Sequence, residues 1–219
     1  MTLTNNQIAE LFRFCEQKYV RYYDLQVELV DHLAERIEEE TVTHPELSFD
    51  DALAKVYKGF GIFGFAHIVR DKETSLRKQT NKLWLKELVS YFTLPKLLLT
   101  ISSLLLFYFS GDFFSPDTRK WIIVTLWLIG YVYQTVQLVR FKRSESKKLM
   151  LTQYYPVSIL CVTMFFFDQL IFLPETINSL IGFSIWGTLA LIIQSTLIEV
   201  NRGIGQKARK LYPEAFNMA

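Results

Sequence analysis

The sequence predicts an all-α protein, with a small cytoplasmic helical bundle followed by a four-helix transmembrane bundle. Apolar residues recur at helical spacing through residues 1–70. Residues 94–200 then contain four apolar stretches of a length that can cross a bilayer. A strongly charged break, Arg-Phe-Lys-Arg-Ser-Glu-Ser-Lys-Lys at residues 140–148, divides these stretches into two pairs.

Charge is distributed unevenly over the 219 residues. Residues 1–70 carry 7 basic and 12 acidic residues, whereas residues 71–219 carry 17 basic and 10 acidic ones. An acidic head argues against direct binding of nucleic acid, which requires Lys and Arg to replace phosphate counterions. The N-terminus lacks a basic region followed by an apolar core, so we expect no cleavable signal peptide and a head that stays in the cytoplasm.

The first predicted helix follows Thr4, which with Gln7 has the spacing of a capping box. Ile8, Leu11 and Cys15 then fall on one apolar face. We interpret Cys15 as a buried structural thiol, because thiolate chemistry needs an electropositive and partly exposed setting. The second cysteine lies in an apolar stretch, so a disulfide between the two is not expected.

The second predicted helix has Asp24 as its cap. Four apolar residues recur every four positions along it: Leu25, Leu29, Leu33 and Ile37. His32 lies at the edge of this stripe beside Glu28 and Glu35. It reads either as a metal ligand or pH sensor, or as a boundary histidine hydrogen-bonded to a carboxylate. A single helix offers too few converging ligands for a metal, which favours the second interpretation.

The third predicted helix starts after Ser48, with two acidic residues in its first turn. Its apolar stripe ends at Gly59 and Gly61. Residues 62–69 then form either a short fourth helix or the beginning of a linker. The head is therefore a bundle of three or four helices, whose core at this size benefits from packing on a partner or a membrane surface.

The head resembles the small helical prefix domains of bacterial membrane proteins, namely the HAAS-type domain and the permease-prefix domains. The resemblance covers roughly residues 5–70 and rests on Asp31-His32-Leu33, a Pro-containing turn, and Phe49-Asp50-Asp51-Ala52-Leu53 running into a Gly-rich stop. It implies a head that precedes several transmembrane helices and acts in regulation or signalling at the membrane. It implies no catalytic residues.

A polar and amphipathic connector helix is predicted over residues 71–93, with aromatic and basic residues suited to a membrane interface. The four predicted spans follow at residues 94–114, 121–139, 149–173 and 177–200, and a basic cytoplasmic tail is expected over residues 201–219. Lys96 near the start of the first span is expected to extend its amine toward the interface.

Orientation follows from the distribution of Lys and Arg. Residues 70–86, 140–148 and 202–210 hold 6, 5 and 4 basic residues, and the loops on the opposite side hold 2 in all. By the positive-inside rule, head, central turn and tail are cytoplasmic in a multi-pass protein of the inner membrane. The residues expected to set this topology in the central turn are Arg140, Lys142, Arg143, Lys147 and Lys148.

Polar residues inside the predicted spans are the default functional candidates there. They are Gln134, Gln137, Gln153, Asp168 and Gln194. A transport path needs several ionisable groups converging at mid-depth, whereas one acid and scattered amides favour hydrogen bonds between helices. Near the inner interface, Glu199 is expected to pair with Arg202.

The predicted function is that of an integral membrane protein that anchors a cytoplasmic partner-binding domain, in regulation or signal relay. The residues expected to contact the partner are Glu28, His32, Glu35, Phe60, Phe63 and Phe65. The alternative is a small transporter, or its accessory subunit, with Asp168 and the span glutamines lining the path. Expected partners are membrane lipid, a cytoplasmic protein and further copies of the chain. No motif argues for an enzyme, a metal or a cofactor, so we expect none.

Overall fold

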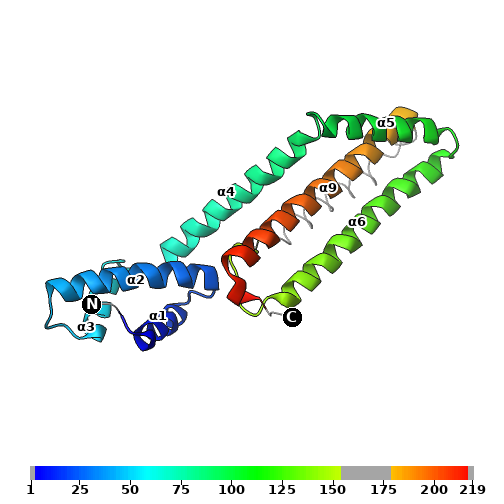
Figure 1. Ribbon diagram of the computed structural model, residues 1–219. Coiled ribbons are helices and arrows are strands. Elements are labelled where there is room, and N and C mark those ends of the chain that lie inside the picture. The colour runs from blue at the N-terminus through cyan, green and yellow to red at the C-terminus, as the bar shows by residue number, and fades with distance from the viewer. Residues whose placement is uncertain (1–2, 154–178, 217–219) are drawn as a thin grey trace. The chain divides into compact units, whose positions relative to one another are not determined.

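The computed structural model describes residues 3–153 and 179–216, and the described part is all-α (Figure 1). Its helices are α1 (Asn5–Gln17), α2 (Tyr23–Thr43), α3 (Phe49–Lys58), α4 (Ala66–Ser90), α5 (Lys96–Gly111), α6 (Pro116–Ser144) and α9 (Leu180–Leu211), followed by a short 3₁₀ helix at Pro213–Ala215. The chain forms two compact units. Unit 1 comprises Met1–Arg77, Glu145–Leu151 and Ala208–Ala219, and unit 2 comprises Lys78–Ser144 and Thr152–Lys207.

The predicted helix starts in unit 1 are confirmed at α1 and α3. Thr4 and Gln7 form the capping box, with the Gln7 amide donating to Thr4 Oγ1 and the Thr4 amide donating to Gln7 Oε1. At α3, the Asp51 amide donates to Ser48 Oγ at 3.2 Å. These caps satisfy amides that the first turn of a helix leaves without partners.

The core of unit 1 contains the predicted apolar stripes and the predicted buried thiol. Leu11, Leu33 and Ile37 are fully buried, and so is Cys15. Burial, with a further contribution from the charge of Glu16, raises the pKa of the Cys15 thiol to about 12. This side chain is therefore a neutral packing group and not a thiolate at physiological pH.

An aromatic cluster joins α1, α3 and the turn that leads into α4. The ring of Phe65 contacts those of Phe14, Tyr57 and Phe60 edge to face. Gly64 lies beside this cluster with φ of +51°, and a Cβ atom there would be 2.4 Å from the Tyr57 hydroxyl. Both the left-handed backbone and the lack of space therefore require glycine at this turn.

The predicted connector is part of a longer helix. Residues 62–69 do not form a separate fourth helix, because α4 begins at Ala66 and continues without interruption through the polar stretch to Ser90. The connector helix was predicted to end at residue 93, but α4 ends at Ser90 and turns then lead into α5. The predicted connector helix is thus present over residues 71–90, and its start at Ala66 was not predicted.

Unit 2 contains the two helices in the described part that are long and apolar enough to cross a membrane, α6 and α9. The apolar helix α5 has 16 residues and is shorter than a typical span. Residues 149–153, at the start of the predicted third span, are not helical, and the rest of that span lies outside the described residues. The four predicted spans are thus not all shown. Helix α9 runs past the predicted end at residue 200 to Leu211.

The helices of unit 2 share an apolar core and approach one another closely at a glycine. Phe107, Ile123, Trp127 and Phe183 form a shared core between α5, α6 and α9. At Gly187 an added Cβ atom would be 2.8 Å from the Phe107 ring. Close approach at glycine is typical of helices that associate in lipid, where van der Waals packing replaces the hydrophobic effect.

Candidate functional site

The first turn of α2 binds the backbone that follows α6. The Asp24 carboxylate accepts hydrogen bonds from the amides of Met150 (2.8 Å) and Leu151 (2.9 Å), and also from the amide of Leu25 (3.1 Å). One residue earlier, the Tyr23 amide donates to the Lys148 carbonyl at 2.8 Å. We name this set the Asp24 junction: Tyr23, Asp24, Lys148, Met150 and Leu151.

Burial makes the Asp24 junction energetically significant. Asp24 is 6% exposed, and Leu149 and Met150 are 1% and 2% exposed. A buried carboxylate is tolerated when several amides hydrogen-bond to it, and those amides in turn need an acceptor. The prediction that Asp24 caps α2 is corrected here, because Tyr22 occupies the cap position and Asp24 lies inside the helix.

The C-terminal segment joins the same loop from another side. The amides of Ser146 and Lys147 donate to the Ala215 carbonyl at 2.9 and 3.3 Å. Glu145 and Phe216 form an antiparallel β-bridge. Residues 145–151 are therefore fixed both by the start of α2 and by the residues that follow α9.

The predicted basic turn at residues 140–148 is partly helical. Arg140, Lys142 and Arg143 lie on α6, which ends at Ser144. Lys147 and Lys148 lie on the loop, and the Lys147 ammonium is 3.7 Å from the centre of the Tyr23 ring. The head thus contacts this loop through the Asp24 carboxylate, the Tyr23 amide and the Tyr23 ring.

Three residues predicted to bind a partner line one cavity of about 260 Å³: Glu28, His32 and Phe60. Its floor is apolar, with Leu25, Leu29 and Ile68. At its rim, Glu28 pairs with Lys72, and the Arg36 guanidinium is 5.5 Å from the centre of the Phe60 ring.

The other predicted partner-contact residues lie elsewhere. Phe63 is 78% exposed and Glu35 is also exposed, so both are accessible. Phe65 is 2% exposed and belongs to the aromatic core of unit 1, which corrects its place on the predicted contact surface. Its ring makes three edge-to-face contacts. Helical spacing in the sequence does not predict these contacts.

In unit 2, two of the predicted span glutamines meet. Gln134 Nε2 on α6 donates to Gln194 Oε1 on α9, and both side chains are buried. Gly130 makes room for Gln194, since a Cβ atom at that glycine would lie 2.4 Å from the amide carbon. Gln137 lies near this pair and lines a separate cavity of about 390 Å³ with Gln134, Tyr133, Ile198, Asn201 and Arg202.

Another predicted intramembrane polar residue, Gln153, does not join the pair. Gln153 is exposed in a turn and is not part of a helix. Asp168 lies outside the described residues. The hydrogen bond between Gln134 and Gln194 is the kind of interhelical contact that the amide side chains predict.

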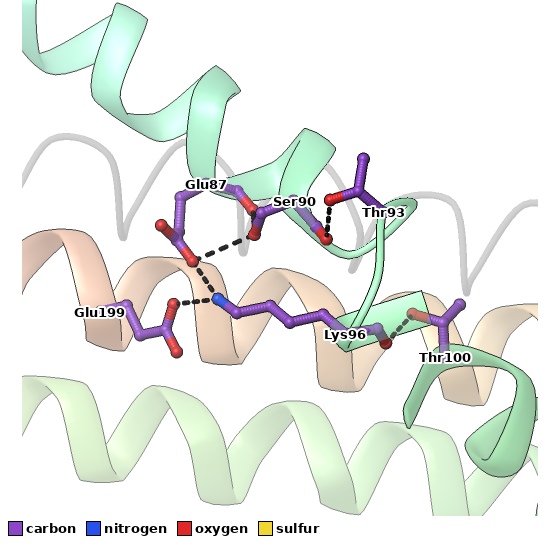
Figure 2. Close-up of polar contacts among 6 residues, drawn as sticks. All are labelled: Glu87, Ser90, Thr93, Lys96, Thr100 and Glu199. Carbon is purple, nitrogen blue, oxygen red and sulfur yellow. Dashed lines mark hydrogen bonds and ion pairs between the residues drawn. The ribbon is translucent and has the colours of Figure 1, made fainter. Parts of the chain in front are cut away.

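A charged cluster that the sequence did not predict lies at the corner between α4 and α5 (Figure 2). Lys96 Nζ is 2.7 Å from Glu199 Oε2 on α9 and also pairs with Glu87 on α4. The Lys96 ammonium lies 4.6 Å from the centre of the Tyr91 ring. Glu199 therefore pairs with Lys96, which corrects the expected pairing with Arg202.

Comparison with family models, with characterised proteins and with solved structures finds no match to this chain. The resemblance of residues 5–70 to bacterial prefix domains therefore stays a prediction. Within residues 3–153 and 179–216, His, Cys, Asp and Glu side chains form no group of three that could hold a metal ion. The arrangement found here is one of charge-stabilised contacts between distant chain segments.

Proposed function

We propose that the protein is a multi-pass inner-membrane protein that relays a change in its membrane-embedded helices to a cytoplasmic, partner-binding unit. Unit 1 is the cytoplasmic unit in this proposal, and both termini lie on its side. Four spans cross the bilayer, two of them α6 and α9. The carrying observation is the Asp24 junction, in which unit 1 incorporates the loop that directly follows α6.

The apolar surface of unit 2 supports the membrane assignment. The apolar stretch of α6 is long enough to cross a membrane, yet only 17% of this stretch is buried inside the protein. Its exposed side chains include Leu128, Ile129 and Val132, which are 51%, 62% and 57% exposed. Water-soluble proteins rarely expose an apolar surface of this extent, whereas lipid stabilises it.

Chain connectivity supports the relay. The chain passes between the units four times, after Arg77, Ser144, Leu151 and Lys207. Residues 145–151 leave unit 2 at the end of α6 and re-enter it seven residues later, and the buried Asp24 carboxylate holds their backbone. In this proposal, a movement of α6 displaces this segment, which is part of the core of unit 1, and thereby acts on unit 1.

The partner in this proposal is a cytoplasmic protein that contacts the cavity of Glu28, His32 and Phe60. The cavity combines an apolar floor with charged groups at its rim. The resemblance to HAAS-type and permease-prefix domains agrees with a regulatory role for this unit. No catalytic residue, metal or cofactor enters the proposal.

Bilayers of different thickness provide the test of relay. The full chain is reconstituted in nanodiscs of short-chain and long-chain lipid, because mismatch changes the tilt of spanning helices. Trypsin cleavage after Lys147 and Lys148 reports opening of the loop. We expect the cleavage rate to depend on thickness in the wild-type protein, and to be high and independent of thickness in Asp24→Ala. Equal rates in all bilayers for both proteins would contradict relay.

Topology is tested by cysteine accessibility in spheroplasts, in a background without native cysteines (Cys15→Ala, Cys161→Ser). An impermeant maleimide should label Asp117→Cys, in the first turn of α6, from outside. It should label Lys147→Cys only after permeabilisation. Labelling of both sites in intact spheroplasts would reject the proposed orientation.

The cavity beside Gln137 favours transport as a second candidate function, because buried Gln134 and Asn201 line it together with Arg202. Its test is substrate flux or proton flux in liposomes, comparing wild type with Gln137→Leu and with Asp168→Asn. Flux that both substitutions abolish would replace relay by transport. Absence of flux in all three proteins would leave relay as the better proposal.

A further inference from the structure

Unit 1 contains a cavity of about 390 Å³ between α1, the start of α2 and the loop at residues 147–148. Three of its lining residues are basic, namely Arg21, Lys147 and Lys148, and one is acidic, Glu16. The lining therefore has an excess of two positive charges, although residues 1–70 as a whole are acidic. A local reversal of charge inside a cavity indicates an anionic ligand.

Tyr23 positions these cations. Its backbone amide binds the Lys148 carbonyl at 2.8 Å, and its ring lies 3.7 Å from the Lys147 ammonium. The ring also stacks on Phe12, with 6.0 Å between centroids and 16° between planes. The two lysines come from a distant part of the chain, so the fold itself brings them to Arg21.

The charges are not neutralised internally. Within the described residues, Arg21 and Lys148 form no ion pair, and Lys147 contacts only a ring with its ammonium. The positive charges in excess of Glu16 repel one another, and a bound anion relieves this repulsion.

We propose that this cavity binds a phosphate group, carried either by a soluble phosphorylated compound or by a phospholipid headgroup. The guanidinium of Arg21 offers two parallel donors that match phosphate geometry, and the ammonium groups of Lys147 and Lys148 add compact positive charges. Glu16 repels the ligand and thereby limits its affinity.

Phosphate bound here contacts both the α2 side and the loop side of the Asp24 junction. It therefore stabilises the arrangement in which residues 145–151 are bound to Asp24, since a ligand that binds one state shifts the equilibrium toward that state. The binding site itself does not depend on relay and stands even if the proposed function is rejected.

The soluble source is tested with inorganic pyrophosphate and the full chain in phosphatidylcholine nanodiscs, by isothermal titration calorimetry. We expect Arg21→Gln to weaken binding by roughly tenfold, the loss of one charge-assisted contact. Arg13→Gln is the matched control, because Arg13 is an exposed cation on α1 that does not line the cavity. It should leave binding unchanged, and Glu16→Gln should tighten it.

The lipid source is tested by adding phosphatidylglycerol to the nanodiscs and following trypsin cleavage after Lys147 and Lys148. Slower cleavage in wild type and in Arg13→Gln, but not in Arg21→Gln, identifies the headgroup as the ligand. Pyrophosphate binding without this lipid effect identifies a soluble ligand. The proposal is overturned if neither probe acts, or if Arg21→Gln and Arg13→Gln respond alike to both.

Discussion

The Asp24 junction in unit 1 and the Lys96 cluster in unit 2 each hold a charged side chain between distant chain segments, but by different means. Asp24 is 6% exposed and is bound by three backbone amides. Lys96 is bound by two carboxylates, and its side chain is 28% exposed, compared with 28% for Glu87 and 45% for Glu199.

This difference indicates different roles. Backbone amides cannot rotate away or change their charge, so the Asp24 contacts are insensitive to salt and specific for one position of the loop. Carboxylates on flexible side chains are screened by solvent and contribute little to stability. We infer that the Asp24 junction determines the position of the loop, whereas the Lys96 cluster only adjusts the corner between α4 and α5.

Replacing Asp24 by Ala should have the largest effect. The amides of Met150 and Leu151 lose their acceptor in a buried setting, which costs about 3 kcal/mol. SDS-driven unfolding in mixed micelles, followed by circular dichroism, measures this loss. Asp31→Ala, an exposed acid on the same helix, should change stability by less than about 0.5 kcal/mol. Equal effects of both substitutions would mean that Asp24 acts only through its charge.

The Asp24→Asn variant separates the acceptor from the charge. One carbonyl oxygen remains to accept from Met150 or Leu151, but the new NH₂ group faces the other amide. We expect the free energy of unfolding to fall by about 2 kcal/mol, which is less than the fall for Asp24→Ala. A stability equal to wild type in the same unfolding experiment would show that the negative charge is unnecessary.

The Gln134–Gln194 hydrogen bond should contribute an intermediate amount. A double-mutant cycle with Gln134→Leu and Gln194→Leu should give a coupling energy of about 1 kcal/mol, typical of polar contacts between helices in lipid. Additive effects of the two substitutions would show that the pair contributes only packing.

Substitution of Lys96 by Met should cost about 0.5 kcal/mol at low salt, because the ion pairs are partly exposed. The cost should diminish as salt is raised toward about 1 M, where the screening length is about 3 Å. The Asp24→Ala cost should stay constant over the same salt range. A salt dependence of equal size at both sites would remove the contrast between them.

The pH dependence of stability at the corner between α4 and α5 should be the smallest effect. A hydrogen bond with the Glu199 carboxyl group and then one from the Lys96 ammonium hold the pKa of Glu87 below its usual value of 4.5. A lowered pKa means that this contribution to stability is present above pH 4.5 and is lost as the pH falls through the folded-state pKa. Glu87→Gln should abolish this part of the pH profile, and an unchanged profile would rule out Glu87 as its source.

Features encoded locally in the sequence were predicted correctly. Thr4 and Ser48 cap their helices, and the Leu11 and Leu33 stripes form the core, because capping and amphipathic spacing depend on neighbours within one or two turns. The site contacts depend on tertiary proximity. Asp24 was interpreted as a helix cap, since nothing near it in the sequence indicates that Met150 and Leu151 would supply amides.

The errors in unit 2 have a similar origin. Composition predicted an apolar segment from residue 94, but α5 ends at Gly111, where the chain turns toward α6. Glu199 was paired with the nearest cation in sequence, Arg202, whereas the fold brings Lys96 to it. Sequence spacing predicts which side chains are neighbours on the same helix, but it gives no information about cations on another helix.

Hydrogen exchange at the amides of Met150 and Leu151 tests the central claim most directly. In the full-length protein these amides should exchange as slowly as the core of α2, because Asp24 is their acceptor. Asp24→Ala should accelerate them by roughly a hundredfold, equivalent to about 3 kcal/mol, while Asp31→Ala should leave them protected. Rapid exchange of both amides in the wild-type protein would contradict a loop held by Asp24.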